Sequence, residues 1–206
     1  MKDFELPRLY PITDRRLSGL THAAQVEQLI DGGARLIQLR DKESSPKEFF
    51  AEAVAAIAIA RAHKVKILIN DRADIALCAG ADGVHLGQTD LPPAAARKIL
   101  GKRAIIGFST HNLEQAIAAL KLPIDYLAVG PIFATSTKEN PDKVLGLQNL
   151  QLIRREIGSF PLVAIGGIKS ENARACLAAG ANSIAVVSAL LEKSEAIAEA
   201  TAAFFD

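Results

Sequence analysis

The chain has 206 residues, half of them hydrophobic, with 24 lysines and arginines against 23 aspartates and glutamates. This length allows one large domain, and the net charge of +1 argues against a general nucleic-acid binder, which would present a strongly basic face. The N-terminus lacks the apolar core of a signal peptide, and no apolar run approaches the length of a membrane span. Two cysteines, Cys78 and Cys176, do not suggest a disulfide framework, so we expect a cytoplasmic protein.

Short apolar strands alternate with helical segments along the chain. At three joints a helix ends in Gly, Ala follows and an apolar strand begins: Gly33-Ala34, Gly80-Ala81 and Gly180-Ala181. Glycine suits a helix C-terminus because it adopts the left-handed conformation without a steric penalty. We expect strands at 8–13, 34–39, 66–70, 83–86, 103–108, 125–129, 161–165 and 183–187. Helical patterns lie between them, at 21–31, 46–63, 72–79, 92–100, 112–120, 147–157, 170–179 and 189–205.

Eight strand-helix pairs predict an α/β protein with a single (β/α)8, or TIM, barrel over residues 1–206. The strands lack polar alternation, which is typical of parallel strands buried on both faces. An open doubly wound sheet is the alternative, but the first strand leads into Thr13-Asp14 rather than into a glycine-rich fingerprint. In a barrel, the C-terminal ends of the strands form the active-site face. We therefore look for chemistry where each strand ends.

The second strand ends in a run of charged residues. Its alternation places Gln38, Arg40 and Lys42 on one side. An arginine fork and a lysine point charge at the mouth of a barrel are typical of a phosphate clamp. The alternative is a solvated basic loop, paired with Asp41 and Glu43.

The third and fourth strands both end in polar residues with a carboxylate. Asn70-Asp71 follows one strand, and Asp90 lies shortly after the other. Two carboxylates on neighbouring parallel strands suit a magnesium ion, which takes one or two carboxylates and leaves its other positions for water and substrate phosphate. Alternatively, each aspartate caps a helix, Asp71 the one that starts at Arg72 and Asp90 the one after Pro92.

The fifth and sixth strands lead into loops with hydroxyl and basic side chains. Ser109 or Thr110 could cap the next helix, and His111 is a candidate general base, although a lone loop histidine is more often a bystander. The long connection from Pro131 to Gly146 resembles a phosphate-contacting lid, and loops of this length tend to be functional. Its polar residues are Thr135, Ser136, Thr137 and Lys138.

The seventh and eighth strands indicate a second anion site. Gly166-Gly167 lets the backbone approach an oxyanion closely, and Ser188 stands where the last helix begins. Loops after these two strands of a barrel often hold a phosphate on backbone N–H groups. A tight turn and an N-cap serine would have the same pattern without a ligand. Two anion sites would accept two phosphorylated substrates, or one that is doubly phosphorylated.

Seven stretches together resemble the thiamine-phosphate synthase family, in the right order over nearly the whole chain. They are 9–14, 38–42, 69–72, 83–90, 106–111, 130–138 and 164–168. The resemblance implies a (β/α)8 barrel that joins 4-amino-2-methyl-5-hydroxymethylpyrimidine diphosphate to 4-methyl-5-(2-phosphonooxyethyl)thiazole, giving thiamine phosphate and pyrophosphate. It also implies Mg²⁺ as cofactor, held by Asp71 and Asp90.

The resemblance assigns further residues to each substrate, with Lys138, Arg40 and Ser109 as the catalytic ones. Around the pyrimidine diphosphate it implies Gln38, Arg40, Lys42, Asn70, Ser109 and Lys138. Around the thiazole phosphate it implies Thr135, Thr137, Gly167, Val187 and Ser188. In the implied mechanism pyrophosphate departs first and the thiazole nitrogen then attacks the stabilised cation, which needs charge neutralisation and placement rather than acid-base work. The absence of an evident nucleophile-base pair in the sequence agrees with this.

Two rival functions stay open at this point. A thiazole tautomerase of similar fold would use His111 as its acid-base residue and no pyrophosphate. A catalytically silent barrel could bind a phosphorylated metabolite as a sensor, but would not explain Arg40, Lys42, Asp71 and Asp90 together. We expect small phosphorylated partners and neither nucleic acid nor membrane; a homo-oligomer is compatible with the sequence, although no heptad or apolar patch specifies one.

Overall fold

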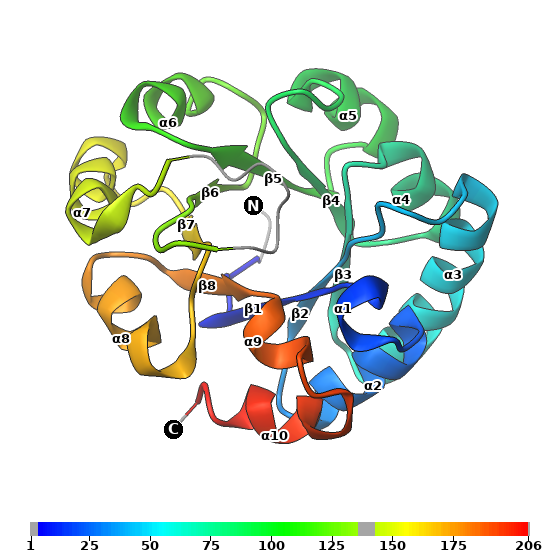
Figure 1. Ribbon diagram of the computed structural model, residues 1–206. Coiled ribbons are helices and arrows are strands. Elements are labelled where there is room, and N and C mark those ends of the chain that lie inside the picture. The colour runs from blue at the N-terminus through cyan, green and yellow to red at the C-terminus, as the bar shows by residue number, and fades with distance from the viewer. Residues whose placement is uncertain (1–3, 136–142, 206) are drawn as a thin grey trace.

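The computed structural model describes residues 4–135 and 143–205. Within them, parallel strands close into a barrel in sequence order, and β8 pairs with β1 (Figure 1). The strands are β1 (Leu9–Thr13), β2 (Leu36–Leu39), β3 (Lys66–Asn70), β4 (Gly83–Leu86), β5 (Ile105–Thr110), β6 (Tyr126–Val129), β7 (Leu162–Ile165) and β8 (Ser183–Val186). The predicted (β/α)8 barrel is confirmed.

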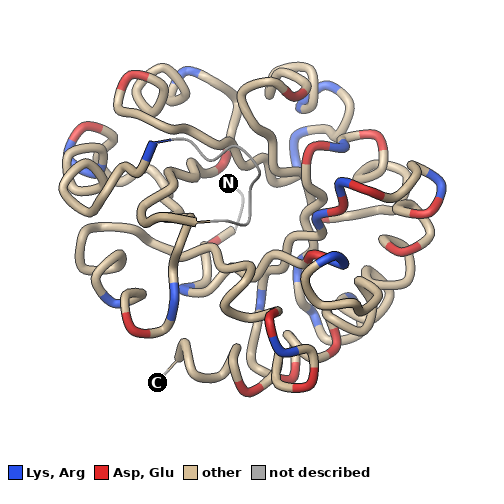
Figure 2. The backbone as a smooth tube through the Cα atoms, in the orientation of Figure 1, with Lys and Arg blue, Asp and Glu red and all other residues tan. Residues whose placement is uncertain are grey.

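Helices form a ring outside the strands (Figure 1). They are α1 (Arg15–Ser18), α2 (His22–Asp31), α3 (Pro46–Ala62), α4 (Ala73–Ala79), α5 (Pro93–Leu100), α6 (Leu113–Ala119), α7 (Gly146–Ile157), α8 (Ser170–Ala178), α9 (Ser188–Leu191), the 3-10 helix η1 (Ser194–Ala196) and α10 (Ile197–Ala202). Basic and acidic positions are interspersed around this ring (Figure 2). Among the described residues, no helix combines the length and the apolar character needed to cross a membrane.

Three elements differ from the expectation. β5 continues to Thr110, because Ser109 and Thr110 stay in the ladder opposite residues 128 and 129 of β6. The C-terminal helix expected over 189–205 is broken into α9, η1 and α10, with Lys193 in an extended conformation. The short helix α1 was not expected, and the Asp14 side chain caps it by accepting from the amides of residues 16 and 17.

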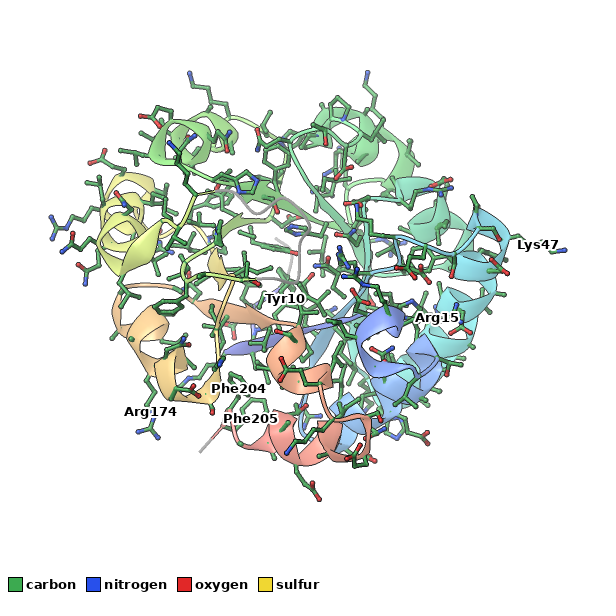
Figure 3. The ribbon with its side chains drawn as sticks, viewed as in Figure 1. Tyr10, Arg15, Lys47, Arg174, Phe204 and Phe205 are labelled. Atoms are coloured by element: carbon green, nitrogen blue, oxygen red, sulfur yellow. The ribbon has the colours of Figure 1, made fainter. Side chains whose placement is uncertain are left out.

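The strands separate two hydrophobic cores. The larger core lies between the sheet and the helices, and a smaller cluster fills the inside of the barrel. Tyr10, Leu68 and Tyr126 are fully buried in that inner cluster, and Phe4 and Leu6, which precede β1, pack against it. Figure 3 shows Tyr10 at the centre of the barrel, whereas Lys47 and Arg174 point away from it. A filled interior leaves the mouth of the barrel as the place for a ligand.

A repeated two-point joint ties neighbouring strands together at the end opposite the mouth. Asp82 donates its amide hydrogen to the Ile67 carbonyl, and its side chain accepts from the Ile67 amide. Asp125 does the same with Ile106, and Asn182 with Leu162. Asp82 and Asn182 are the residues that follow Gly-Ala in the repeat seen in the sequence. We call these three contacts the strand joints.

Candidate active site

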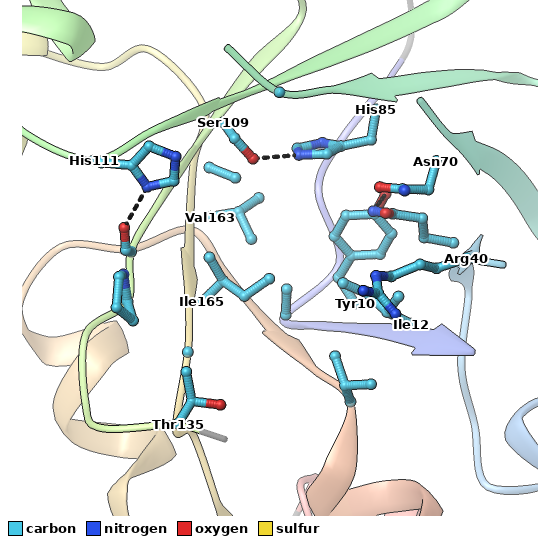
Figure 4. A pocket seen from close by; sticks show the side chains of 18 of the residues that line it. Tyr10, Ile12, Arg40, Asn70, His85, Ser109, His111, Thr135, Val163 and Ile165 are labelled. Carbon is cyan, nitrogen blue, oxygen red and sulfur yellow. Dashed lines mark hydrogen bonds between the residues drawn. The ribbon is translucent and has the colours of Figure 1, made fainter. Parts of the chain in front are cut away.

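A cavity of about 560 Å³ opens at the C-terminal ends of the strands (Figure 4). Every site residue predicted from the sequence within the described ranges lines it: Gln38, Arg40, Lys42, Asn70, Asp71, Asp90, Ser109, Thr135, Gly167, Val187 and Ser188. Thr137 and Lys138, with the rest of the predicted lid over 136–142, lie outside the described residues. Residues from strands far apart in the sequence thus share one hollow.

One side of the cavity carries the paired carboxylates and a lysine. The ammonium of Lys42 forms an ion pair with the Asp71 carboxylate. Burial raises the pKa of Asp90, and the adjacent Asp71 carboxylate raises it further through a hydrogen bond and charge repulsion. Asp90 also accepts a hydrogen bond of 2.6 Å from the Gly87 amide. Among the residues that the structure describes, the two neighbouring carboxylates share one ammonium, that of Lys42, so this side of the cavity carries excess negative charge.

Neither aspartate caps a helix. The N-cap of α4 is Arg72 and that of α5 is Pro92, and neither helix receives a side-chain capping bond. Asp71 instead adopts a left-handed conformation with φ of +62°, which is uncommon for a residue with a side chain and often occurs at functional sites. The capping alternative for Asp71 and Asp90 is therefore wrong.

The serine caps considered from the sequence are wrong as well. Asn112 caps α6 by accepting from the Gln115 amide, so neither Ser109 nor Thr110 is needed there. The N-cap of α9 is Val187, without a side-chain bond, and Ser188 is the first helical residue. Ser109 and Ser188 thus have no capping duty.

Arg40 is held in place by a residue that sequence reasoning missed. Its guanidinium donates to the Asp14 carboxylate at 2.6 Å. Asp14 is almost fully buried and also caps α1. The sequence does contain a signal for Asp14, because this carboxylate is the first residue after β1, just as Asp71 is the first residue after β3. The ion pair fixes the direction of the arginine fork at the cavity rim.

The opposite side of the mouth is built by glycines. Gly166 and Gly167 have φ of +99° and +63°, a region that favours glycine. A Cβ on Gly167 would lie 2.4 Å from the Ala134 carbonyl oxygen and 2.8 Å from Cβ of Phe133. Gly167 therefore lets the loop after β7 pack directly on the loop after β6. The side chain of any substitute would meet that loop first, before it met a ligand.

His111 lines the cavity, and its imidazole is oriented by the backbone. Its Nδ1 lies 2.8 Å from the Gly130 carbonyl oxygen, which can only accept, so Nδ1 carries the hydrogen (Figure 4). The backbone amide of His111 donates to the Gln115 side chain.

A buried set of polar side chains under the cavity was not foreseen. His85 of β4 contacts the Ser109 hydroxyl through Nε2, at 2.8 Å (Figure 4). Its Nδ1 contacts the Tyr126 hydroxyl, also at 2.8 Å. The Tyr126 hydroxyl lies 2.9 Å from that of Tyr10, which accepts from Gln38 Nε2 at 2.8 Å. Only the two ends of this set, Gln38 and Ser109, were recognised in the sequence.

The contact between Ser109 and His85 is a serine-histidine pair, which the sequence did not reveal. Burial lowers the pKa of His85 from 6.5 to about 4, so the ring is neutral and a weak base at neutral pH. Its second nitrogen meets the hydroxyl of Tyr126, where an activated pair would have a carboxylate. The pair thus orients Ser109 and does not make it a nucleophile.

Comparison with known proteins identifies the family of the chain. The family model of thiamine monophosphate synthase matches residues 9–190 of the chain. The chain belongs to that family. The thiamine-phosphate synthase of Koribacter versatilis is 47% identical over 194 residues, covering 91% of this chain and 90% of that protein. That of Chloroflexus aurantiacus is 45% identical, covering 94% and 89%.

The fold of the chain also matches that of a solved structure. Thiamine phosphate pyrophosphorylase from Pyrococcus furiosus superimposes with a TM-score of 0.86 and 37% sequence identity, over 96% of this chain and 93% of that one. The family membership and the barrel therefore rest on independent comparisons of sequence and of structure.

This family implies a magnesium ion, and Asp71 and Asp90 are the residues that would hold it. The described residues contain no cluster of three or more His, Cys, Asp or Glu side chains able to hold a metal. Magnesium does not need such a cluster, because one or two carboxylates, water and substrate phosphate complete its coordination. Burial raises the pKa of Asp90 and the adjacent Asp71 carboxylate raises it further, and a cation beside the two carboxylates would stabilise their charged forms. The residues fit the ion.

Proposed function

We propose that the chain makes thiamine phosphate at this cavity, as a transferase of the thiamine-phosphate synthase type. It joins 4-amino-2-methyl-5-hydroxymethylpyrimidine diphosphate to 4-methyl-5-(2-phosphonooxyethyl)thiazole and releases pyrophosphate. The observation that carries the proposal is the meeting of Arg40, Lys42, Asp71 and Asp90 at one side of a single cavity, in a chain that is 47% identical to a thiamine-phosphate synthase.

The charged side of the cavity would hold the pyrimidine diphosphate. Arg40 and Lys42 supply positive charge for the diphosphate, Arg40 as a fork oriented by Asp14. Gln38 and Asn70 supply amide groups for the polar edge of the pyrimidine. Ser109 stands beside the leaving group, and Lys138 is assigned to it by the resemblance alone, since that residue lies outside the described ranges.

A magnesium ion held by Asp71 and Asp90 would neutralise charge on the departing pyrophosphate when bound. Lys42, paired with Asp71, would move part of its interaction to the diphosphate once the cation balances the carboxylates. Lys42 thus pairs with Asp71 without substrate, and the ion would compensate the excess negative charge of the two carboxylates when it is bound.

The opposite side would hold the thiazole phosphate. The proposed contacts are Thr135, Gly167, Val187 and Ser188, together with Thr137 from the sequence resemblance. The bond between the exocyclic carbon and the diphosphate oxygen breaks, with the electron pair leaving on pyrophosphate, and the thiazole nitrogen then forms the new bond to that carbon. The residues bind, orient and neutralise charge, and no serine attack is needed, consistent with the neutral His85.

Release of pyrophosphate is the assay that separates this function from its rivals. The synthase forms pyrophosphate and thiamine phosphate only when both substrates and Mg²⁺ are present. A thiazole tautomerase would convert the thiazole phosphate isomer without pyrophosphate, and a sensor would bind without turnover. We further propose a cytoplasmic location, because Cys78 and Cys176 are both free thiols.

A further inference from the structure

A continuous chain of hydrogen bonds crosses the interior of the barrel below the cavity. It links Gln38 on β2, Tyr10 on β1, Tyr126 on β6, His85 on β4 and Ser109 on β5. The four contacts measure 2.8, 2.9, 2.8 and 2.8 Å. All but Ser109 are at least 93% buried. We call this set the interior chain. Both of its ends line the cavity, and its middle residues have no partner in the proposed chemistry.

The donors and acceptors of the interior chain can be followed from one end to the other. In the direction that we assign, Gln38 Nε2 donates to the Tyr10 oxygen and the Tyr10 hydrogen points to the Tyr126 oxygen, so that every hydroxyl hydrogen inside the chain has an acceptor. Tyr126 then donates to Nδ1 of His85, which leaves the hydrogen of a neutral ring on Nε2. His85 Nε2–H donates to Ser109 Oγ. The Ser109 hydrogen is then left without an acceptor inside the chain, and it is available to the cavity.

A glycine makes room for the middle of the interior chain. Gly107 of β5 is the register partner of His85 on β4 and of Tyr126 on β6. A Cβ at this position would lie 2.2 Å from the Tyr126 hydroxyl and 2.5 Å from His85 Nδ1. The two rings also stack, with centroids 5.6 Å apart and planes 26° apart. Packing thus fixes the His85 ring while the hydrogen bonds fix its tautomer.

We propose that Tyr10, Tyr126 and His85 are positioning residues, which hold the Ser109 hydroxyl as a hydrogen donor toward the leaving diphosphate and the Gln38 amide oxygen toward the pyrimidine. The proposal rests on the proposed function for the identity of these two ligands. A serine that lines the cavity and accepts from Nε2–H can turn its hydrogen toward the cavity, where an anionic oxygen is the natural acceptor. The reverse direction of the chain would instead present a lone pair of Ser109 to an anion, which is repulsive.

The tautomer of His85 tests the direction of the chain without any activity. With ¹⁵N-histidine in the whole protein at neutral pH, long-range proton–nitrogen spectra identify which ring nitrogen carries hydrogen, and the His85 signals are assigned by their loss in His85→Gln. We expect hydrogen on Nε2 of His85. Hydrogen on Nδ1 would mean that Ser109 donates to His85, and would overturn the proposal even in a fully active enzyme.

A matched pair of substitutions tests the positioning role. The Gln side chain places a donor near the position of Nε2, whereas Asn reaches only as far as Nδ1. We expect His85→Asn to lower kcat about tenfold, the effect of losing one oriented hydrogen bond, with KM for the thiazole phosphate unchanged. His85→Gln should recover most of this loss, and exposed His63→Gln serves as the control substitution.

A double-mutant cycle separates positioning from structure. Because His85 acts through Ser109, His85→Asn should change kcat less than about twofold when Ser109 is already Ala. Equal losses in both backgrounds, or equal losses in the Asn and Gln variants, would show a purely structural role and overturn the proposal. A wild-type protein that releases no pyrophosphate would instead overturn the proposed function, and the tautomer measurement would still decide the direction of the chain.

Discussion

The backbone amide of Asp71 donates a 2.8 Å hydrogen bond to the carbonyl of His85. This bond extends the ladder between β3 and β4 by one residue, because β3 ends at Asn70. Asp71 is thus tied to the sheet while its φ of +62° turns the chain away. The carboxylate is consequently fixed to the rigid barrel and does not depend on the loop that follows, which is what a metal ligand requires.

The first prediction concerns the metal. Asp71→Asn and Asp90→Asn should each lower turnover roughly 100-fold or more, because each removes a ligand of the ion that would compensate charge on the leaving group. The double variant should fall far short of the product of the two effects, since both act through one ion. Steady-state kinetics across a magnesium titration measure this, and full activity of either single variant would refute the metal assignment.

The chain offers a matched control for these variants. Asp74→Asn removes a nearby carboxylate that is exposed and paired with Arg72 outside the cavity. Asparagine tolerates the left-handed conformation of residue 71 and can still accept from the Gly87 amide at residue 90. We therefore expect all three variants to unfold at nearly the wild-type temperature, and only Asp74→Asn to keep its activity.

The second prediction concerns Lys42. Lys42→Gln should raise KM for the pyrimidine diphosphate roughly tenfold, because one charge-assisted contact to phosphate is lost. Its stability should change little, since Lys42 is 55% exposed and an exposed ion pair contributes little to folding. Lys66→Gln is the control: Lys66 also pairs with an aspartate, Asp82, but at the opposite end of the barrel. Equal kinetics of the two variants would contradict the clamp.

The third prediction concerns Gly167. Gly167→Ala should reduce both thermal stability and thiazole phosphate binding, because its Cβ would collide with the loop at residues 133 and 134. Gly19→Ala is the control that separates backbone strain from this collision, because Gly19 has φ of +72° but nothing within 4 Å of an added Cβ. We expect it to lower the free energy of unfolding by about 1 kcal/mol. Calorimetry of folding and of binding measures both effects. A Gly167 variant as stable as the Gly19 variant would disprove the close packing.

The fourth prediction concerns pH. Burial disfavours the charged form of the His85 ring and lowers its pKa from 6.5 to about 4. Between these two values the unfolded chain binds more protons than the folded one, so the free energy of unfolding rises with pH. His85 should contribute about 3 kcal/mol to this rise, complete above pH 6.5 and lost toward pH 4. Denaturant titrations of wild type, His85→Gln and the His63→Gln control measure it; identical slopes in all three would refute it.

Much of the architecture was readable from the sequence because apolar strands, glycine helix ends and cap residues are local signals. Eight alternations sufficed for the barrel, and the barrel then placed the strand ends at one face. The secondary structure predicted from the sequence was wrong where no local signal marked the true one. No Gly or Pro marks the break near Lys193, and Ser109 and Thr110 are polar residues that stay in a strand because they pair with β6.

The residues of the candidate site also divide into those with a local signal in the sequence and those without one. Asp71, Asp90 and Arg40 stand out at strand ends, so their meeting in the cavity could be predicted. Tyr10, Tyr126 and His85 lie inside apolar strands and appear in the sequence as core residues. Their contacts join residues 41 and 116 positions apart, and no local pattern encodes them. The interior chain becomes visible only once the ring of strands closes.

The strand joints are relevant to the order in which the strands of the barrel come together during folding. Each ties two residues that are 15, 19 or 20 positions apart, and such short-range contacts form readily before a protein's ends meet. The barrel can thus be regarded as strand pairs β3–β4, β5–β6 and β7–β8 that are locally complete, while Arg35 stands where the first pair would have its joint. In a chain organised in this way each pair supplies its own share of the frame, whereas the cavity at the mouth and the interior chain form only when the pairs come together in the closed barrel.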